Sequence, residues 1–175
     1  MTRTKLLLIA LVALTTACTK SSSPSGPSTP ELPRTYVFTA AMSPANEVPP
    51  ITNAEAGGRG DATITLTVTR DSGGTITAAT VVFTANFSSF PNGTAFTAAH
   101  IHEGGPTCAC PVKISTNLAS GEVVLANGTG TLQKTNIASA VDVAQGMINN
   151  PANYYFNVHT ALNPGGVARG PLVKN

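Results

Sequence analysis

Apolar and polar residues alternate along much of the chain beyond residue 34. In residues 61–69, Ile64, Leu66 and Val68 fall on one face and threonines fall on the other. A period of two with one apolar face is the pattern of a strand that is buried on one side only. Turn sequences, such as Asp-Ser-Gly-Gly at 71–74, separate this segment from others of similar length. The pattern predicts strands at residues 35–42, 61–69, 75–87, 96–102, 111–115, 121–126, 128–133, 153–159 and 167–173.

One segment, residues 137–148, has helical periodicity instead. Its apolar positions recur at helical spacing, as Ile137, Ala140, Val141, Ala144 and Ile148. Thr135 or Asn136 is a suitable cap for the start of this helix, and Pro151 would end it. Many short strands and one helix predict an all-β fold, an antiparallel Greek-key β-sandwich or barrel with a short amphipathic helix lying across it.

The N-terminus has the features of an export signal. Residues 6–14 form an apolar run of nine residues that follows two basic residues. Such a run is too short to span a bilayer as a helix, which needs about 20 residues, but it suits a signal-peptide core. Small residues and then Cys18 follow, an order that resembles the bacterial lipobox, although Thr15 stands where that pattern usually has Leu. We therefore predict a lipoprotein signal peptide at residues 1–17 and a lipid on Cys18; ordinary signal cleavage with an incidental Cys18 is the alternative.

The segment after the signal predicts a tether and not a second domain. Residues 18–34 are rich in Ser, Pro, Thr and Gly and bury little apolar surface, so we expect a flexible linker before a domain at 35–175. Loss of the signal leaves eight of the ten Lys and Arg residues against eight Asp and Glu residues. This balance, without a basic patch, argues against nucleic acid as a partner. The expected location is the bacterial cell envelope, with the membrane as one partner and an unidentified protein or glycan as another.

Three motifs together identify a family resemblance. They are SPANEVPP at residues 43–50, AAHIHEG at 98–104, and YFNVHT at 155–160, which continues through NPGG at 163–166 to Arg-Gly at 169–170. In this order they resemble the CHRD domain, which was named from chordin and also occurs alone in bacterial exported proteins. The resemblance implies an extracellular β-sandwich and no established catalytic activity. The expected function is therefore a non-enzymatic binding or structural module at the membrane surface, including a matrix or adhesion component.

All three histidines of the chain fall in these motifs. His100 and His102 are two residues apart on a predicted strand, so their side chains leave the same face about 6.6 Å apart. His159 lies on a late strand that a Greek key can bring alongside. Three imidazoles with an open position suit zinc or copper, which makes a copper- or zinc-binding metalloprotein, including one like superoxide dismutase, the alternative function. A hydrogen-bonded polar cluster with a purely structural role is the competing interpretation.

Two further pairs of residues carry chemistry. Cys108 and Cys110 are expected to form a local disulfide outside the cytoplasm, although a pair of soft metal ligands is an alternative. Glu47 and Arg169 are charged residues within the motifs of a weakly charged chain. We predict an ion pair between them that ties residues 43–50 to the last strand; two separate solvated charges are the alternative.

Overall fold

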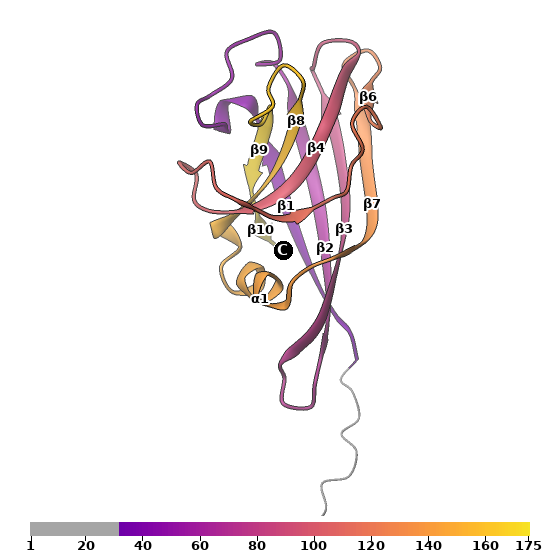
Figure 1. Ribbon diagram of the computed structural model, residues 1–175, viewed down its shortest axis with the longest axis vertical. Helices are drawn as coiled ribbons and strands as arrows, with labels where there is room; N and C mark the ends of the chain where they lie inside the picture. The colour runs from indigo at the N-terminus through magenta and orange to yellow at the C-terminus, as the bar shows by residue number, and fades with distance from the viewer. Residues whose placement is uncertain (1–31) are drawn as a thin grey trace, which may run out of the picture.

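The computed structural model describes residues 32–175, which form two antiparallel β-sheets packed face to face (Figure 1). The first sheet has the strand order β10-β1-β2-β3-β7, and the second has the order β5-β4-β8-β9 with the short β6 also paired to β4. The predicted signal peptide, Cys18 and most of the predicted linker lie outside the described residues.

The strands of the first sheet are β1 (Arg34–Met42), β2 (Arg59–Arg70), β3 (Ile76–Ser88), β7 (Gly130–Ala138) and β10 (Val173–Lys174). Those of the second sheet are β4 (Thr94–Glu103), β5 (Val112–Ser115), β6 (Val124–Leu125), β8 (Tyr154–Thr160) and β9 (Ala168–Pro171). The helices are α1 (Val141–Asn149) and two 3₁₀ turns, η1 (Pro44–Asn46) and η2 (Pro151–Asn153). The all-β prediction is confirmed, and the two sheets form a sandwich and not a closed barrel.

The alternation along β2 determines which face of the first sheet is buried. Ile64, Leu66 and Val68 are fully buried, as the period of two predicted, while Thr63 and its neighbours on the other face meet solvent. This holds because side chains on alternate positions of a strand point to opposite faces and only one face of this sheet meets the other sheet.

Aromatic side chains fill the space between the two sheets. Phe83 of β3 stacks on Phe156 of β8, with ring centroids 5.5 Å apart and an angle of 25° between the ring planes. Phe87, Phe90 and Phe96 form a second group in which each ring meets the others edge to face. Each group joins a residue of the first sheet to a residue of the second, Phe83 to Phe156 and Phe87 to Phe96, so both hold the sandwich together across its layers.

The helix begins later than its periodicity predicted. α1 starts at Val141, with Ala140 as an N-cap residue that makes no side-chain capping bond. Ile137 belongs instead to β7, where it pairs with Val81 of β3. Strand pairing at the sheet edge provides hydrogen bonds for the backbone of residue 137, and the sheet buries its apolar side chain. The predicted start of the helix at residue 137 was therefore wrong, because periodicity alone could not distinguish a helical from a paired strand position. Asn149 is the last residue of α1, two residues before the expected stop at Pro151.

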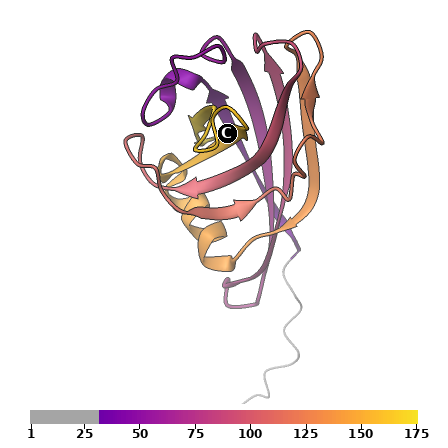
Figure 2. The same cartoon turned by 45° about the horizontal axis from the view of Figure 1, so that its top comes forward.

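Strand β8 is buried on both of its faces. Every residue from Tyr154 to Thr160 is buried, although β8 belongs to a sheet with only one face toward the core. The outer face is covered by residues 43–58, which contact the turn between β8 and β9, and by residues 104–111. Figure 2 shows the first of these segments beside the β8–β9 turn at the same end of the sandwich. A second interior, which is polar, therefore lies between the outer face of this sheet and the two covering segments, and it contains the candidate site.

Among residues 32–175, no helix has the length and apolar character needed to cross a bilayer.

Replacement of Phe83 by Ala tests the contact between the sheets. We expect the free energy of unfolding to fall by about 3–5 kcal/mol, because a fully buried ring that touches the other sheet would leave a cavity. The measurement is chemical denaturation followed by circular dichroism. Leu162→Ala is the control, since Leu162 is 57% exposed and its loss should change stability by no more than about 0.5 kcal/mol. Equal losses in the two variants would contradict this account of the core.

Candidate functional site

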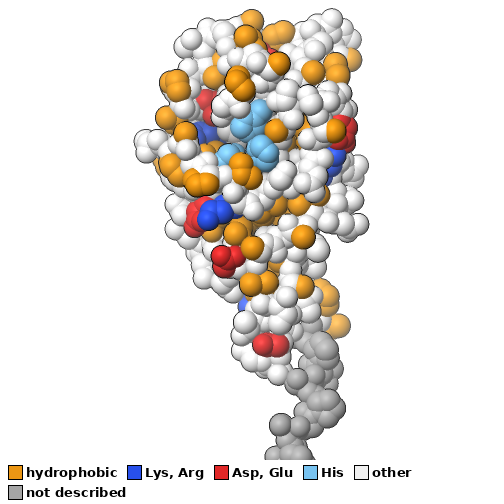
Figure 3. Space-filling view, in the orientation of Figure 1, with side chains coloured by type: hydrophobic (Ala, Val, Ile, Leu, Met, Phe, Trp, Pro, Cys, Tyr) orange, Lys and Arg blue, Asp and Glu red, His pale blue; other side chains and the backbone are white. Residues whose placement is uncertain are grey.

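The three histidines lie on the outer face of the second sheet. In the antiparallel pairing of β4 with β8, Ala98 stands opposite His159, His100 opposite Asn157, and His102 opposite Tyr155. Residues that stand opposite one another point to the same face, so this register places all three imidazoles together. Figure 3 shows them as one contiguous patch that reaches the surface of the molecule.

The imidazole nitrogens converge on a small volume. One ring nitrogen of each histidine lies within 4.8 Å of those of the other two. The closest approach is between His100 Nδ1 and His159 Nε2, at 3.2 Å. His100 is partly exposed, whereas His102 and His159 are 7% and 8% exposed. The register of β4 and β8 therefore brings together the three residues that the sequence nominated.

Backbone carbonyls fix the tautomers of two of these rings. His102 Nδ1 lies 2.7 Å from the carbonyl oxygen of Cys110, and His159 Nδ1 lies 2.9 Å from that of Pro164. A carbonyl oxygen only accepts hydrogen bonds, so both Nδ1 atoms carry the proton and both Nε2 atoms carry a lone pair. The Nε2 atom of His102 is buried and has no hydrogen-bond partner within the described part of the chain.

The surroundings favour the neutral form of each imidazole. Burial and, to a smaller extent, the like charges of the neighbouring His159 and His102 together lower the pKa of His100 to about 4. Burial also lowers the pKa of His102, against the hydrogen bond to Cys110, and the pKa of His159, against the hydrogen bond to Pro164. Neutral imidazoles with free lone pairs are the form that binds a metal ion.

This donor set fits a tetrahedral ion with one open position. Nitrogens bound to such an ion at about 2.0–2.1 Å lie about 3.3 Å from one another. The shortest nitrogen–nitrogen separation in the cluster, 3.2 Å, is close to that value, and side-chain rotations would have to shorten the longer ones, which reach up to 4.8 Å. The bonds from His102 and His159 to backbone carbonyls are of the kind that orients histidines in metal sites. Among residues 32–175, these three histidines make up the whole group of ligands, which suits zinc or copper.

Tyr155 and Arg169 extend the site across the sheet. The rings of His102 and Tyr155 lie parallel, with an angle of 1° between them and centroids 4.9 Å apart. The guanidinium carbon of Arg169 lies 4.6 Å from the Tyr155 centroid, in a cation–π contact. Sequence patterns predicted no role for Tyr155, although it begins the third motif. Its alternation with Asn157 and His159 was the signal that placed it on the same face.

Arg169 joins the two segments that cover this face of the sheet. Its guanidinium donates to the carbonyl of Asn46, at 2.5 Å, in one segment. It also donates to the carbonyls of Cys108, at 2.7 Å, and Pro106 in the other. Arg169 is only 3% exposed, so its guanidinium is removed from water, and these carbonyls accept the hydrogen bonds that water would otherwise accept.

Glu47 is the acidic group nearest to that guanidinium. Its Oε2 atom lies 4.0 Å from Arg169 Nε, and Asn157 Nδ2 donates to both of its oxygens at 3.1 and 3.3 Å. Burial raises the pKa of Glu47 to about 7, although Arg169 and Asn157 act against that rise. Gly166 makes room for the carboxylate, since a β-carbon there would lie within 2.9 Å of both carboxylate oxygens.

A second buried carboxylate, which the sequence did not single out, holds the same covering segment. Glu55 Oε2 accepts hydrogen bonds from Thr160 Oγ1 at 2.7 Å and from Asn163 Nδ2 at 2.5 Å. Asn53 also bonds to Asn163. These contacts attach residues 53–55 to the β8–β9 turn, the turn that supplies the carbonyl for His159. A lone Glu outside the motifs gave no sequence signal of this role.

Cys108 and Cys110 form a disulfide, with their Cα atoms 5.2 Å apart. Their main-chain atoms meet the site directly. The Cys110 amide donates to the Tyr155 hydroxyl at 3.1 Å, and that hydroxyl donates to the Cys108 carbonyl at 3.2 Å.

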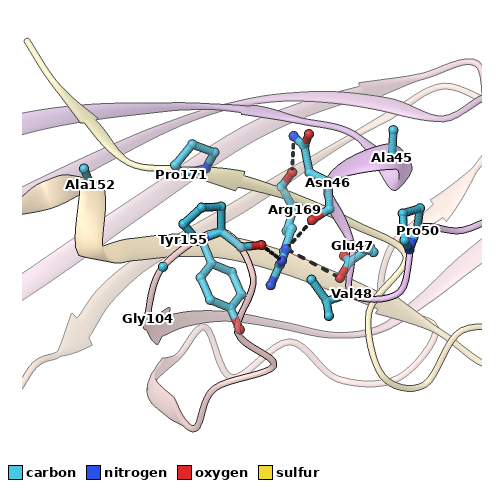
Figure 4. A pocket seen from close by; sticks show the side chains of 12 residues that line it. Ala45, Asn46, Glu47, Val48, Pro50, Gly104, Ala152, Tyr155, Arg169 and Pro171 are labelled. Carbon is cyan, nitrogen blue, oxygen red and sulfur yellow. Dashed lines mark hydrogen bonds and ion pairs between the residues drawn. The ribbon is translucent and has the colours of Figure 1, made fainter.

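A cavity of about 420 Å³ opens beside these residues (Figure 4). Its polar lining comes from Asn46, Glu47 and Arg169, and Tyr155 forms part of its wall. The rest of the lining is small or apolar: Ala45, Val48, Pro50, Gly104, Gly105, Pro106, Ala152 and Pro171. Because Tyr155 stacks on His102 and also lines this cavity, the histidine cluster and the cavity share one side chain.

Comparison with known proteins identifies one domain. The family model described as CHRD domain matches residues 38–172, a range that includes all three histidines, Glu47 and Arg169. No curated protein and no solved structure gives a significant match. The family match supports a binding or structural module. Since it covers most of the chain, this protein belongs to the CHRD domain family.

Proposed function

We propose that this chain is an exported CHRD module that binds one zinc or copper ion through His100, His102 and His159. The observation that carries the proposal is the convergence of three neutral imidazoles, one ring nitrogen from each lying within 4.8 Å of the others. Their backbone hydrogen bonds orient the Nε2 lone pairs of His102 and His159 away from the carbonyls that hold Nδ1.

A purely structural polar cluster explains this arrangement less well. Such a cluster would satisfy its own buried donors and acceptors, because an unpaired buried polar atom costs about 1–3 kcal/mol. His100 and His159 meet that requirement with each other, but His102 Nε2 is buried without a partner. A metal ion would use that lone pair and would replace the contact between His100 and His159 with two metal bonds.

Access from solvent supports ion exchange at the site. His100 is partly exposed, and the imidazoles form a surface patch in Figure 3. Three protein ligands leave a tetrahedral ion with one position for water or an exogenous ligand. A carrier or binding role needs only a bound ion that solvent can reach, whereas a superoxide-handling enzyme would also need turnover at the open position. Dismutase activity that persists in the variant with all three histidines changed to Ala would exclude an enzyme at this site.

Purified tag-free protein should bind one zinc ion per chain. We expect His159→Ala to weaken zinc binding by more than about 100-fold, because loss of a ligand exceeds the 10–100-fold effect of losing an outer contact. Competition with a chromophoric chelator measures the affinity, and a parallel titration with copper(II) compares the two ions. Asp61→Ala is the control, since Asp61 is an exposed acidic residue on the first sheet. Equal binding by the two variants, or no stoichiometric binding by the wild type, would refute the proposal.

The affinity for zinc should change little between pH 7.5 and pH 6. An ordinary histidine, with a pKa near 6.5, becomes mostly protonated across this interval and then competes with the metal. Here burial lowers the pKa of all three histidines, that of His100 to about 4, so protons compete only at lower pH. The same chelator competition, repeated across pH, tests this. A tenfold or larger loss of affinity by pH 6 would contradict it.

We also propose that a lipid on Cys18 holds this module at a membrane of the bacterial cell envelope. The support is the sequence: an apolar run of nine residues, small residues, Cys18, and then a Ser/Pro-rich segment. The fold is compatible with such a tether, because β1 runs for nine residues, from Arg34 to Met42, and ends next to the covering segment at 43–58. The tether would thus join the sandwich about 30 Å from that segment, at the other end of β1.

Replacement of Cys18 by Ser should abolish lipid attachment. In a bacterial host grown with labelled palmitate, we expect the wild type to carry label and to sediment with membranes, and the Cys18→Ser variant to lose both properties. The matched control is the Cys108→Ser/Cys110→Ser double variant, which removes the other cysteines of the chain and should keep the label. A labelled Cys18→Ser protein would refute the anchor.

A further inference from the structure

One loop holds His102 in its metal-binding orientation. Residues 104–111 connect β4 to β5, and the Cys110 carbonyl of this loop accepts the hydrogen bond from His102 Nδ1. No side chain performs this task, so the position of the Cys110 backbone determines the tautomer and the direction of the ring. Whatever moves that backbone also moves a ligand of the proposed site.

The loop itself is fixed where the two cysteines lie. The Tyr155 hydroxyl bonds to the Cys110 amide and the Cys108 carbonyl, and Arg169 donates to the same Cys108 carbonyl. Together with the stacking of Tyr155 on His102, these contacts link Arg169 through Tyr155 to the proposed ligand His102. Displacement of residues 108–110 would therefore break several contacts together.

The disulfide keeps these three residues compact. Cys108 and Cys110 have Cα atoms 5.2 Å apart, whereas an extended strand would place them about 6.6 Å apart. The bond also lies against the backbone of Gly104, where a β-carbon would overlap the Cys110 sulfur. Gly104, Gly105 and Pro106 precede it, and none of them carries a side chain that anchors the loop by hydrogen bonding. Both cysteines are partly exposed, so a reductant can reach them.

We propose that the Cys108–Cys110 disulfide positions His102 for the metal ion, so that its reduction weakens metal binding at the three-histidine site. The inference rests on the proposed function. The reductant is a dithiol: it passes two electrons and two protons to the protein, the Cys108–Cys110 bond breaks to give two thiols, and the dithiol becomes a disulfide. Reduction frees residues 108–110 to extend, and His102 loses its fixed carbonyl partner.

Zinc affinity measured in both redox states tests the proposal. The oxidised wild type is compared with wild type that has been reduced with a dithiol and then freed of it under nitrogen, by competition with a chromophoric chelator. We expect affinity about 10–100-fold lower after reduction, the range for loss of an outer contact to a metal ligand. The Cys108→Ser/Cys110→Ser variant should bind zinc as weakly as the reduced wild type and should not respond to the dithiol. Equal affinities in the two states would overturn the proposal.

Two further measurements separate positioning of His102 from other effects. In His102→Ala, reduction should leave the residual zinc affinity unchanged, because the coupling runs through that ring. A reduction effect that persists there would overturn the proposal. Cobalt(II) bound to the reduced wild type should show no thiolate-to-cobalt charge-transfer band; such a band would mean that the thiols act as ligands, and it would also overturn the proposal.

A measurement without metal distinguishes this inference from the proposed function. Nitrogen-15 spectra of the imidazoles should show His102 as the Nδ1–H tautomer in the oxidised protein and as a mixture after reduction. If the oxidised protein binds no zinc but the tautomer still depends on redox state, the metal function is refuted while the positioning by the disulfide stands. If the oxidised protein binds zinc but neither its zinc affinity nor the tautomer depends on redox state, the inference is refuted while the metal function stands.

Discussion

The buried guanidinium of Arg169 is the contact on which the organisation of the site depends. It lies on β9, the edge strand of the second sheet, and donates to carbonyls of both segments that cover that sheet. A planar guanidinium has five N–H groups in fixed directions on three nitrogens and stays charged when buried, so it can donate to several carbonyls that lie apart from one another. Through the Cys108 carbonyl its influence reaches Tyr155 and then His102. The carboxyl group of Glu47, with a pKa raised to about 7, lies 4.0 Å away and is held mainly by Asn157.

The segments that cover the second sheet also change the electrostatics of the site. A sheet of a sandwich usually offers its outer face to water, and histidines there would titrate near pH 6.5. Here the segments at 43–58 and 104–111 exclude water from β8, and the pKa of each histidine falls. The same burial makes the unpartnered Nε2 of His102 costly unless something binds it. Burial thus favours the neutral form of all three imidazoles, backbone carbonyls fix the tautomers of two, and the strand register brings the rings together.

Much of the fold was predictable because its strands carry local signals. The alternation of Ile64, Leu66 and Val68 located β2 and its buried face, and the turn at residues 71–74 separated β2 from β3. The boundary of α1 was not predictable in this way, because Ile137 fits a helical period and a paired strand equally well. Strand β8 also departs from a one-sided pattern, since long-range loops bury its second face. The three histidines lie close together in the structure, and the spacing of His100 and His102 alone already places those two on a common face.

The sequence by itself determined the class of fold, most of the strands and the family, and it nominated the histidines, the cysteines, Glu47 and Arg169 as candidate site residues, because these follow from periodicity and from motifs read along the chain. Only the tertiary structure decided how those residues meet. The register of β4 against β8 put His159 diagonally beside His100, and the covering loops supplied the carbonyls that fix two tautomers. Tyr155, Glu55 and the backbone of Cys110 gained their roles in the same way. The alternation along the strand indicated the face on which Tyr155 lies, but none of these contacts had a signal in the sequence. Each contact depends on a partner that lies far along the chain, or on a main-chain atom that every residue possesses.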